Sequence, residues 1–402
     1  MKLESIKLKN FKAFRDVEIK DIPQFCVFVG ANGTGKSTIF SVFGFLKDLL
    51  SSNVNTALSK HGGVRGIKEV RSRNSEGPIE IEIKFRSEDV INLETSSQPL
   101  ITYTLQIDDE NGKAYIALER LRYRRGSHGQ PWTFLEMKKG EGFAVTNEML
   151  LTETNVNELT TEPQRLKSND ILAIKGLAQF EKFKAVVAFG NLIENWHVSD
   201  IHIEKMRNEQ NVNYAEHLSK DGENLSLVLQ FLYKNHVDIY NKIIEQLKRR
   251  IPGISMVETK ETEEGKILLK LKENAFEDPF LVRYVSDGTI KMLAYLVLLY
   301  DPKPYSLLCV EEPENQLYPS LLEELAEEFR HYGKEGNQVF VSTHSPDFLN
   351  AVNIEEVFLL KKENGYTKIL SAKDNEQIRI YMENGDKMGY LWKQGLFKGI
   401  DP

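Results

Sequence analysis

A glycine-rich segment near the N-terminus combines residue types that bind phosphate groups. It reads Gly30, Ala31, Asn32, Gly33, Thr34, Gly35, Lys36, Ser37, Thr38, and it follows the apolar run Phe25–Val29. Glycines let the backbone curl so that consecutive N–H groups point at phosphate oxygens, and a helix starting near Ser37 would present its positive end to the same anion. Lys36 could reach the terminal phosphates, and the Ser37 hydroxyl could ligate Mg²⁺. The pattern GxxxxGK[ST] therefore predicts a site for a nucleoside triphosphate, with ATP and Mg²⁺ as the expected ligands.

Two adjacent carboxylates at the end of a later apolar run could complete such a site. The run Leu307–Val310 is typical of a buried strand, and Glu311 and Glu312 follow it directly. Glu311 could hold Mg²⁺ through water, and Glu312 could be the general base that polarises the attacking water. Taken alone, the segment is also typical of a strand followed by an exposed acidic turn. The phosphate loop elsewhere in the chain favours the catalytic interpretation.

Two further segments carry residues that could contact a phosphate. Ser286 and Gly288 precede the apolar helix expected at Met292–Tyr300, where serine can cap the helix and glycine lets the backbone approach an anion. A plain helix cap is the alternative interpretation. His344 follows a second apolar strand, Gln338–Thr343. Because strand carboxyl ends in an α/β sheet face the ligand crevice, His344 could hydrogen-bond a γ-phosphate; a structural histidine is the alternative.

The order of these segments resembles that of the ABC-type ATPases of the RecF and SMC branch. After the phosphate loop and a long intervening region come Ser286-Asp-Gly-Thr289, Glu311-Glu-Pro-Glu-Asn315 and Ser342-Thr-His-Ser-Pro346. The start of the chain, Lys9-Asn-Phe-Lys-Ala-Phe14, is also similar to the opening of that branch. The resemblance covers both ends of the chain. It is strongest to compact AAA-family ATPases related to the ATPase half of OLD nucleases.

The resemblance implies a composite site. In that family two ATPase heads sandwich two ATP molecules, and each site combines the phosphate loop of one head with the signature segment of the other. The chain is thus expected to form a homodimer, or a higher homo-oligomer, through ATP. Carried over, Ser286 and Gly288 would contact the γ-phosphate across the dimer. Glu312 would be the base, and His344 would sense the γ-phosphate.

This chain departs from the family pattern at two positions. Ser286-Asp-Gly-Thr289 replaces the usual Ser-Gly-Gly-(Gln/Glu), and Glu311 stands where aspartate is usual. The longer side chain of Glu311 still carries a carboxylate, so slow turnover is compatible with the sequence. The family's glutamine loop should lie between the phosphate loop and the helical region, and spacing does not locate it here.

Length and composition fit a large α/β protein. The 402 residues exceed one average domain, and 41% hydrophobic and 28% charged residues are ordinary for a globular protein. No stretch approaches the roughly 20 apolar residues of a membrane span, and Cys26 and Cys309 lie in apolar runs typical of buried, reduced thiols. We therefore expect a cytoplasmic protein with no membrane contact. The net charge of −7 confines any nucleic-acid contact to local basic patches.

The chain divides into four predicted regions. Residues 1–170 carry the phosphate loop and alternating apolar residues that predict an antiparallel arm of about four or five strands. Residues 171–252 change to a helical period, which predicts a helical insertion or lid. Residues 253–375 hold the signature, acidic and histidine segments, and residues 376–402 form a tail. We expect the α/β fold of an ABC-ATPase head, a mixed sheet with a phosphate-loop core plus an antiparallel β arm, with a helical insertion.

Three features bear on partners. The tail predicts either a short amphipathic docking segment or a strap packed on its own domain. The residues after His344 are too few for the TOPRIM nuclease domain of OLD proteins, so nuclease or toxin activity would belong to a separate effector protein. DNA could be contacted by Arg65–Arg73, Arg120–Arg125 or Lys248–Arg250; a solvated surface is the alternative interpretation.

The leading hypothesis is a cytoplasmic ATPase that dimerises on ATP and acts as a sensor or motor with a separate effector, in anti-phage defence or DNA repair. The setting follows from the resemblance alone. A rival hypothesis is a scaffold that binds ATP, barely hydrolyses it and assembles a nuclease or toxin. The ATPase subunit of an ABC transporter fits less well, because such subunits lack a β arm and helical insertion of this size and normally carry Ser-Gly-Gly-Gln.

Overall fold

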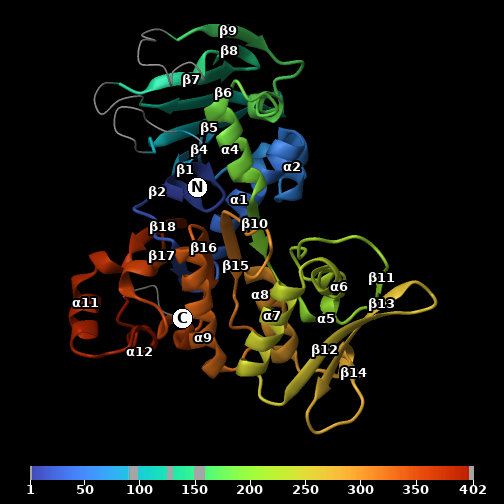
Figure 1. The fold of residues 1–402 in the computed structure, drawn as a ribbon. Coiled ribbons are helices and arrows are strands. Elements are labelled where there is room, and N and C mark those ends of the chain that lie inside the picture. The colour runs from blue at the N-terminus through green and yellow to red at the C-terminus, as the bar shows by residue number, and fades with distance from the viewer. Residues whose placement is uncertain (1, 89, 91–97, 125–129, 149–158, 398–402) are drawn as a thin grey trace.

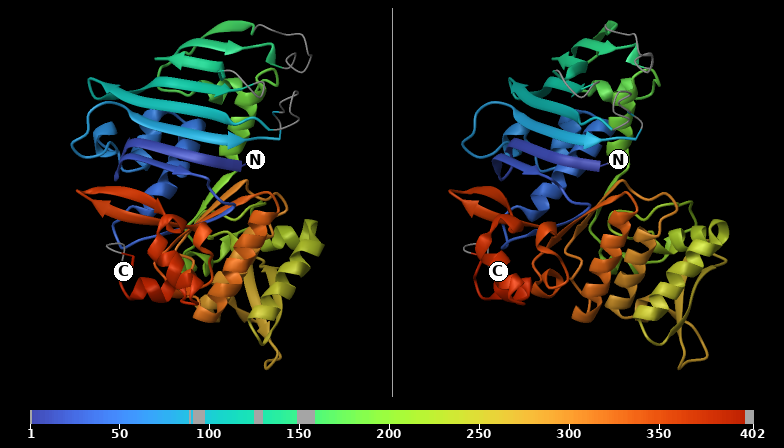
Figure 2. Two further views of the ribbon diagram at one scale, coloured as in Figure 1. Left: turned by 90° about the vertical axis from the view of Figure 1, so that its left-hand side faces the viewer. Right: turned by 60° about the vertical axis from the view of Figure 1, so that its left-hand side comes forward.

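Three β-sheets organise the chain, and helices fill the space around and between them (Figure 1). The computed structural model describes residues 2–88, 90, 98–124, 130–148 and 159–397. Two of the sheets belong to the body of the molecule, and the third lies at its side with a small group of helices (Figure 2). None of the helices in the described ranges is long and apolar enough to cross a membrane.

The largest sheet, here called sheet A, is antiparallel and has eight strands in the order β2-β1-β4-β5-β6-β7-β8-β9. Its strands are β1 (Lys2–Phe11), β2 (Phe14–Lys20), β4 (Ile79–Arg86), β5 (Ile101–Glu110), β6 (Lys113–Tyr123), β7 (Trp132–Lys138), β8 (Glu141–Val145) and β9 (Thr161–Arg165). Strict alternation of buried and half-buried residues along β4 shows why these segments form strands with one core face. The arm is thus longer than the four or five strands expected and is continuous with the N-terminal hairpin. The two added strands, β8 and β9, are short, and β9 is polar throughout.

Four helices cover the core face of sheet A. They are α1 (Lys36–Ser51), α2 (Val54–Lys60), α3 (Ala173–Leu177) and α4 (Lys184–Glu194). The ring of Phe189 in α4 lies with its centroid 4.1 Å from that of Tyr103 and 5.1 Å from that of Phe85, both on sheet A. Residues 173–194 therefore pack with the N-terminal region, although the sequence placed them in the lid.

Two buried glutamates join sheet A to these helices. Both carboxylate oxygens of Glu119 accept backbone N–H bonds at the start of α3, from Ala173 (2.6 Å) and Ile174 (3.1 Å). Glu148 accepts from the backbone N–H of Ala185 in α4 (3.0 Å). Burial raises the pKa of each glutamate to about 7, and the accepted hydrogen bonds only partly oppose this rise.

The pH dependence of stability follows from these two groups. A glutamate whose pKa is higher in the folded state stabilises the fold at low pH, and this contribution is lost as pH rises from about 4.5 towards 7. We expect the free energy of unfolding to fall over that range, by on the order of 2–3 kcal/mol per group. Denaturant unfolding at pH 5 and pH 8 should show a smaller fall for Glu119→Gln than for the unmodified chain. Glu141→Gln, at an exposed position, should keep the full fall; equal falls in all three proteins would contradict the assignment.

The second sheet, sheet B, has strands in the order β10-β15-β16-β3-β17-β18. Its strands are β10 (Trp196–Ser199), β15 (Leu307–Glu311), β16 (Gln338–Thr343), β3 (Phe25–Val29), β17 (Val357–Glu363) and β18 (Tyr366–Ser371). All neighbouring pairs are parallel except β17 and β18. The predicted strand Phe25–Val29 is confirmed; it is fully buried and lies between β16 and β17.

Helices cover both faces of sheet B. Helix α1 packs on the face shared with sheet A, and α8 (Asp287–Leu299) and α9 (Pro319–Lys334) belong to the core of the other face. The register pairs Glu311 of β15 with Ser342 of β16, and Ser342 with Phe28 of β3. The carboxyl ends of these three strands therefore lie side by side. This edge of sheet B is where a ligand crevice is expected.

The third sheet and three helices form a side lobe. Its strands are β11 (Gln210–Asn211), β12 (Ile254–Glu261), β13 (Lys266–Glu273) and β14 (Phe280–Leu281), and its helices are α5 (Ile203–Met206), α6 (Leu225–Asn235) and α7 (Val237–Arg250). Figure 1 shows the sheet and α6 of this lobe to the right of α8, with α7 overlapping α8 in this view. The insertion is thus helical only in part, because strands on both sides of α6 and α7 pair with each other in its sheet.

The C-terminal segment packs on its own domain. Of the two arrangements expected for the tail, a docking segment or a strap on its own domain, it has the second. It comprises α10 (Pro346–Leu349), α11 (Glu376–Glu383) and α12 (Met388–Lys393), beside α9 in Figure 1. Leu391 and Trp392 of α12 are buried in the same core as α8 and α9. The end of the predicted tail, residues 398–402, lies outside the described residues.

Candidate nucleotide-binding and catalytic site

The loop between β3 and α1 depends on glycine for its shape. Gly33 and Gly35 have positive φ angles of 76° and 99°, which side chains other than glycine rarely adopt. At Gly30 an added Cβ atom would lie 2.6 Å from the carbonyl oxygen of Leu360 in β17, so this position also requires glycine. Helix α1 begins at Lys36, one residue before the predicted start. The loop thus has the glycines and the helix N-terminus that the sequence pattern predicts.

The side chain of Lys36 lies inside the loop. It is 7% exposed, and its Nζ donates hydrogen bonds to the carbonyl oxygens of Gly30 (2.7 Å) and Ala31 (3.3 Å). Burial lowers its pKa, while the carboxylates of Glu312 and Glu314 act in the opposite direction. The positive charge is therefore held at the centre of the loop and within the electrostatic reach of both glutamates.

Strand β18, far from the phosphate loop in the sequence, makes a hydrogen bond to this loop. The buried Thr367 donates from Oγ1 to the carbonyl oxygen of Thr34 at 2.6 Å, and its backbone N–H bonds to the carbonyl oxygen of Ala13 at 2.9 Å. The same Oγ1 lies 3.1 Å from the position that a Cβ on Gly35 would take. Sequence reasoning missed this contact, because nothing in the polar run around Thr367 marks it as adjacent to the loop.

Glu311 and Ser37 lie together at the end of β15. Burial raises the pKa of Glu311, and hydrogen bonding with the Ser37 hydroxyl opposes this rise. Both groups offer hard oxygen atoms, the donor type that Mg²⁺ prefers. The described residues contain no cluster of three or more His, Cys, Asp or Glu suited to a metal ion. A magnesium site here therefore fits the pattern in which one or two protein oxygens act together with substrate phosphates.

Asp200 is a further acidic residue at this edge that sequence reasoning missed. It follows β10, the strand next to β15, and its charge also raises the pKa of Glu311. The signal was the same as for His344, namely a polar residue directly after a strand. Strand β10 has only four residues, which made it hard to recognise in the sequence.

Glu312 has a strained backbone and a well-defined side chain. Its φ angle is +42°, in the left-handed region that residues with a side chain rarely occupy. Its backbone N–H bonds to the carbonyl oxygen of Ser342 at 2.9 Å, and its Oε2 accepts from Asn315 Nδ2 at 3.0 Å. Such strain persists where the surroundings fix the conformation, and it is concentrated at functional sites.

His344 lies against two glutamates. Its Nδ1 is 3.3 Å from Oε1 of Glu312 and 3.4 Å from Oε1 of Glu314. The same Glu314 oxygen accepts the backbone N–H of His344 at 2.8 Å and the hydroxyl of Thr343 at 2.7 Å. Glu314, which the sequence showed only as part of the motif, thus fixes the histidine loop to the acidic loop.

Ser286 and Gly288 lie at the N-terminus of α8. Ser286 Oγ accepts the backbone N–H of Thr289 at 3.3 Å, so the predicted helix cap is present. Within the part of the chain that the structure describes, no hydrogen bond or ion pair joins Ser286 or Gly288 to residues 30–38. The structure therefore brings together Lys36, Ser37, Glu311, Glu312 and His344, whereas in the signature segment Ser286 is exposed and Thr289 is buried.

A buried lysine connects α8 to the acidic loop. Lys291, 3% exposed, donates from Nζ to the carbonyl oxygen of Asn315 at 2.6 Å. Asn315 in turn donates to Glu312, so one residue separates the lysine from the candidate base. Burial lowers the pKa of Lys291 to about 8, and the nearby charges of Glu314, Asp200 and Glu312 oppose this change.

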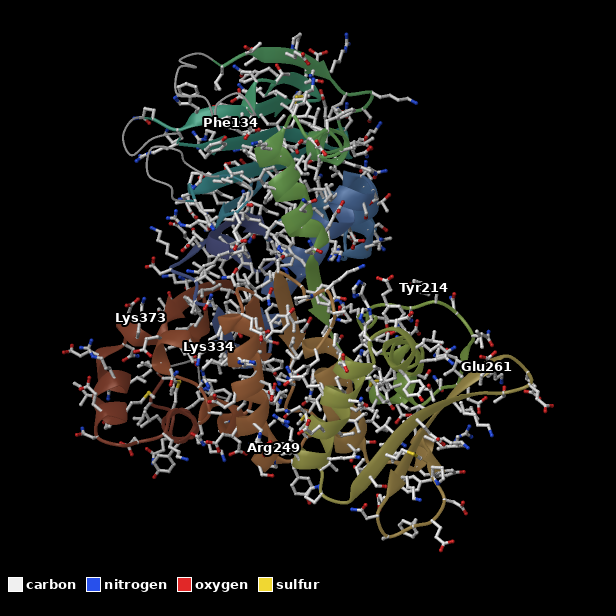
Figure 3. All side chains as sticks on the ribbon, in the orientation of Figure 1. Phe134, Tyr214, Arg249, Glu261, Lys334 and Lys373 are labelled. Carbon is white, nitrogen blue, oxygen red and sulfur yellow. The ribbon has the colours of Figure 1, made fainter. Side chains whose placement is uncertain are left out.

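Each predicted basic cluster is partly neutralised. Arg71 pairs with Asp108 and Asp109, Arg120 with Glu136, and Arg250 with Glu328; Arg125 lies outside the described residues. Figure 3 places Phe134, on the strand next to β6, near the top of the molecule and Arg249 at its lower edge. The clusters on β6 and on α7 therefore do not form one surface.

A comparison with known protein families identifies the family of this chain. A family described as "AAA domain, putative AbiEii toxin, Type IV TA system" matches residues 25–350, from β3 to the end of α10. The chain belongs to this family. The match spans the phosphate loop, the acidic strand and the histidine loop, so this AAA-domain protein carries its family's core across all three parts of the site.

Two curated relatives and two solved structures are similar to this AAA-domain protein. An ATP/GTP phosphatase of Helicobacter pylori is 20% identical over 401 residues, which cover 96% of this chain and 99% of that protein. A DNA replication and repair protein RecF of Paenarthrobacter aurescens is 36% identical over 89 residues, 22% of each chain. An Smc head bound to the C-winged helix domain of ScpA has a TM-score of 0.56 at 16% identity, covering 92% of this chain and 97% of that one.

The second structure is the Smc head with an extended coiled coil, bound to the C-terminal domain of ScpA and derived from Pyrococcus furiosus. Its TM-score is 0.54 at 14% identity, with 95% of this chain and 99% of that chain covered. These two likenesses identify the fold as that of an SMC head. Together with the AAA-domain family and the ATP/GTP phosphatase relative, this fold supports ATP hydrolysis by the chain.

Proposed function

We propose that the AAA-domain protein hydrolyses ATP in two composite sites formed between two copies of the chain, and that this cycle drives a separate effector protein. The observation that carries the proposal is the meeting of three strand ends of sheet B. They bring the phosphate loop, Glu311 with Glu312, and His344 to one edge. Such an edge is where α/β sheets bind their ligands.

The residues at this edge have complementary roles in the proposed reaction. Backbone N–H groups of the loop and the charge of Lys36 would hold the phosphates. Water attacks the γ-phosphorus, and the bond from that phosphorus to the β–γ bridging oxygen breaks, so that ADP leaves with this oxygen. Glu312 takes the proton of the attacking water, and His344 would donate a hydrogen bond to the γ-phosphate. Mg²⁺ held by Ser37 and Glu311 would neutralise charge on the β- and γ-phosphates.

The dimer is supported by the position of the signature segment. Ser286 is exposed at the N-terminus of a 13-residue helix, an arrangement suited to an anion, and among the described residues it makes no hydrogen bond or ion pair with its own loop. Gly288 faces the acidic loop, and a Cβ there would lie 3.3 Å from the carbonyl oxygen of Gln316. A second copy related by twofold symmetry would offer Ser286 and Gly288 to the nucleotide of the first, and the reverse.

A complementation experiment tests the shared site. Lys36→Ala should abolish phosphate binding by the loop of that copy. Ser286→Asp should repel the γ-phosphate, although aspartate can still cap the helix. Each variant alone should be inactive. In an equimolar mixture, half of the dimers carry one intact loop opposite one intact signature, so about a quarter of the wild-type ATPase rate should return. ATPase rate against mixing ratio is the measurement.

The outcomes separate the parts of the proposal. A mixture as inactive as the single variants would contradict sites shared between copies. Full activity of Ser286→Asp alone would show that the signature segment is not part of the nucleotide site. Full activity of Lys36→Ala alone would contradict the loop as the site of hydrolysis.

The effector and its setting rest on the family rather than on the geometry. The family description refers to a putative toxin and a toxin–antitoxin system, and one relative is a RecF protein. The RecF relative is consistent with DNA repair and the toxin–antitoxin description with a defence role, and the proposal places the toxic or nucleolytic step on another chain. Among the described residues of these clusters, DNA contact remains part of the proposal through the exposed Arg65, Lys68, Arg73, Arg124, Lys248 and Arg249, since the paired arginines are neutralised.

A slowly hydrolysing scaffold is the second candidate, and Glu311 favours it. The residue is longer than the aspartate that is usual in the family the sequence resembles, so its carboxylate would be placed differently against the metal ion. Under this alternative, ATP and a slowly hydrolysed analogue should produce the same dimer for the same lifetime. A dimer that dissociates faster with ATP than with the analogue supports the hydrolytic cycle instead.

A further inference from the structure

Helix α12, at the C-terminal end of the described chain, packs directly on α10. Met388, Leu391 and Trp392 bury one face of α12 in the core. The backbone N–H of Gly389 donates to Oδ1 of Asn350, the residue that ends α10, at 2.9 Å. The helix is thus attached by one apolar face and by the hydrogen bond from Gly389.

The contact at Gly389 leaves no room for a side chain. A Cβ atom at this position would lie 1.9 Å from the carbonyl oxygen of Pro346 and 2.6 Å from its carbonyl carbon. Real Cβ atoms do not approach backbone atoms this closely, so either α10 or α12 would have to move. Gly389 is helical and has no positive φ angle, so its backbone conformation does not require glycine. The requirement comes from the close approach to Pro346 alone.

Pro346 is the first residue of α10 and lies two residues after His344. The Ser345 hydroxyl accepts the backbone N–H of Phe348 at 3.3 Å and so caps this short helix. On its other side, the backbone N–H of His344 is held by Glu314 at 2.8 Å. The histidine therefore lies between two attachments, the acidic loop before it and the α10–α12 contact after it.

We propose that Gly389 is a positioning residue for His344: by letting α12 approach α10 closely, it sets where the histidine stands relative to the γ-phosphate and Glu312. The proposal rests on the role of His344 in the proposed function. It assigns the C-terminal strap a part in catalysis that neither the phosphate loop nor the acidic strand supplies. Displacements of about 1 Å in a positioned group can reduce a rate by as much as 10²-fold.

The test compares two glycine-to-alanine changes in helices. Gly389→Ala places a Cβ against Pro346, whereas Gly176→Ala in α3 places one where nothing lies within 4 Å. Alanine is the better helix former by about 0.5–1 kcal/mol, so a lower rate in Gly389→Ala cannot arise from helix propensity. We expect kcat for ATP hydrolysis to fall by about 10- to 100-fold in Gly389→Ala, with KM changed less than about twofold. Gly176→Ala should match the wild type.

Two further variants keep the proposal open to refutation. Asn350→Ala removes the hydrogen bond to Gly389 without a clash, and its kcat should fall by about two- to fivefold. If Gly389→Ala does not fold, an unchanged kcat in Asn350→Ala overturns the proposal. The double variant Gly389→Ala/His344→Ala should have the rate of His344→Ala alone, because both changes act through the same group.

The double-variant cycle separates this inference from the proposed function. If His344→Ala hydrolyses ATP at the wild-type rate, the role of His344 itself is wrong. If His344→Ala is slow but Gly389→Ala is not, only the inference fails. Rate losses that multiply in the double variant also overturn it, since they would place the effect of Gly389 elsewhere.

Discussion

Replacing Glu312 by glutamine should reduce kcat for ATP hydrolysis by about 10²- to 10⁴-fold, the contribution expected of a general base. Glutamine has the same shape and retains an oxygen that can accept from Asn315, so the loop should keep its conformation. It cannot take a proton from the attacking water. Because Lys36, Ser37 and Glu311 are unchanged, ATP binding should remain, and the ATP-bound dimer should accumulate. Single-turnover hydrolysis and size-exclusion chromatography with ATP measure the two effects.

The control for this change is a glutamate remote from the site. Glu335→Gln alters an exposed side chain after α9 and should leave both hydrolysis and dimer formation unchanged. A Glu312→Gln protein that turns over at the wild-type rate would show that another group accepts the proton. The strained backbone at position 312 would then have no catalytic explanation.

The second large effect is expected at Lys291, where replacement should lower activity without lowering stability. Lys291→Met removes the hydrogen bond to Asn315 and with it the support of Glu312, so kcat should fall about tenfold, which corresponds to about 1.4 kcal/mol. Methionine fills a similar volume without a buried charge. The lowered pKa of about 8 indicates that burial disfavours the lysine charge by on the order of 3 kcal/mol. The free energy of unfolding at pH 7 should therefore stay the same or increase.

The lowered pKa of Lys291 also predicts how the free energy of unfolding changes with pH. A lysine with a lower pKa in the folded state releases its proton from the folded protein first, so stability rises with pH between about 8 and 10.5. Denaturant unfolding should show this rise in the wild type and a weaker one in Lys291→Met. Lys47→Met is the matched control, since Lys47 also donates to a backbone carbonyl, that of Trp196, but lies outside the site. Equal losses of kcat in both variants would rule out a specific role for Lys291.

Much of the nucleotide edge of sheet B could be predicted from the sequence. Parallel strands that are buried on both faces appear as short apolar runs, and β3, β15 and β16 all have this pattern. Each is followed at once by the residues that bear on chemistry. Because the carboxyl ends of parallel strands lie at one edge, the proximity of the loop, the glutamates and His344 followed from the strand assignments alone.

The rest depended on contacts between distant segments. The partner of Glu312 is Asn315, whose position is set by Lys291 from another helix. The brace on Thr34 comes from Thr367, and the constraint on His344 comes from Gly389. None of these residues lies in a periodic pattern that marks its partner. The side-lobe sheet was missed for the same reason, since β11 pairs with β13 across α6 and α7.

The position of β3 has a consequence for how the protein is made. The strand that carries the phosphate loop lies between β16 and β17, which end at Thr343 and Glu363. A chain emerging from the ribosome therefore presents its apolar Phe25–Val29 segment long before either neighbour has been synthesised. Pairings of such high sequence separation form slowly, and the unpaired strand is open to aggregation in the meantime. The neighbours of β3 are both present only after Glu363 has been translated, so ATP binding at this edge cannot protect the nascent chain before that point.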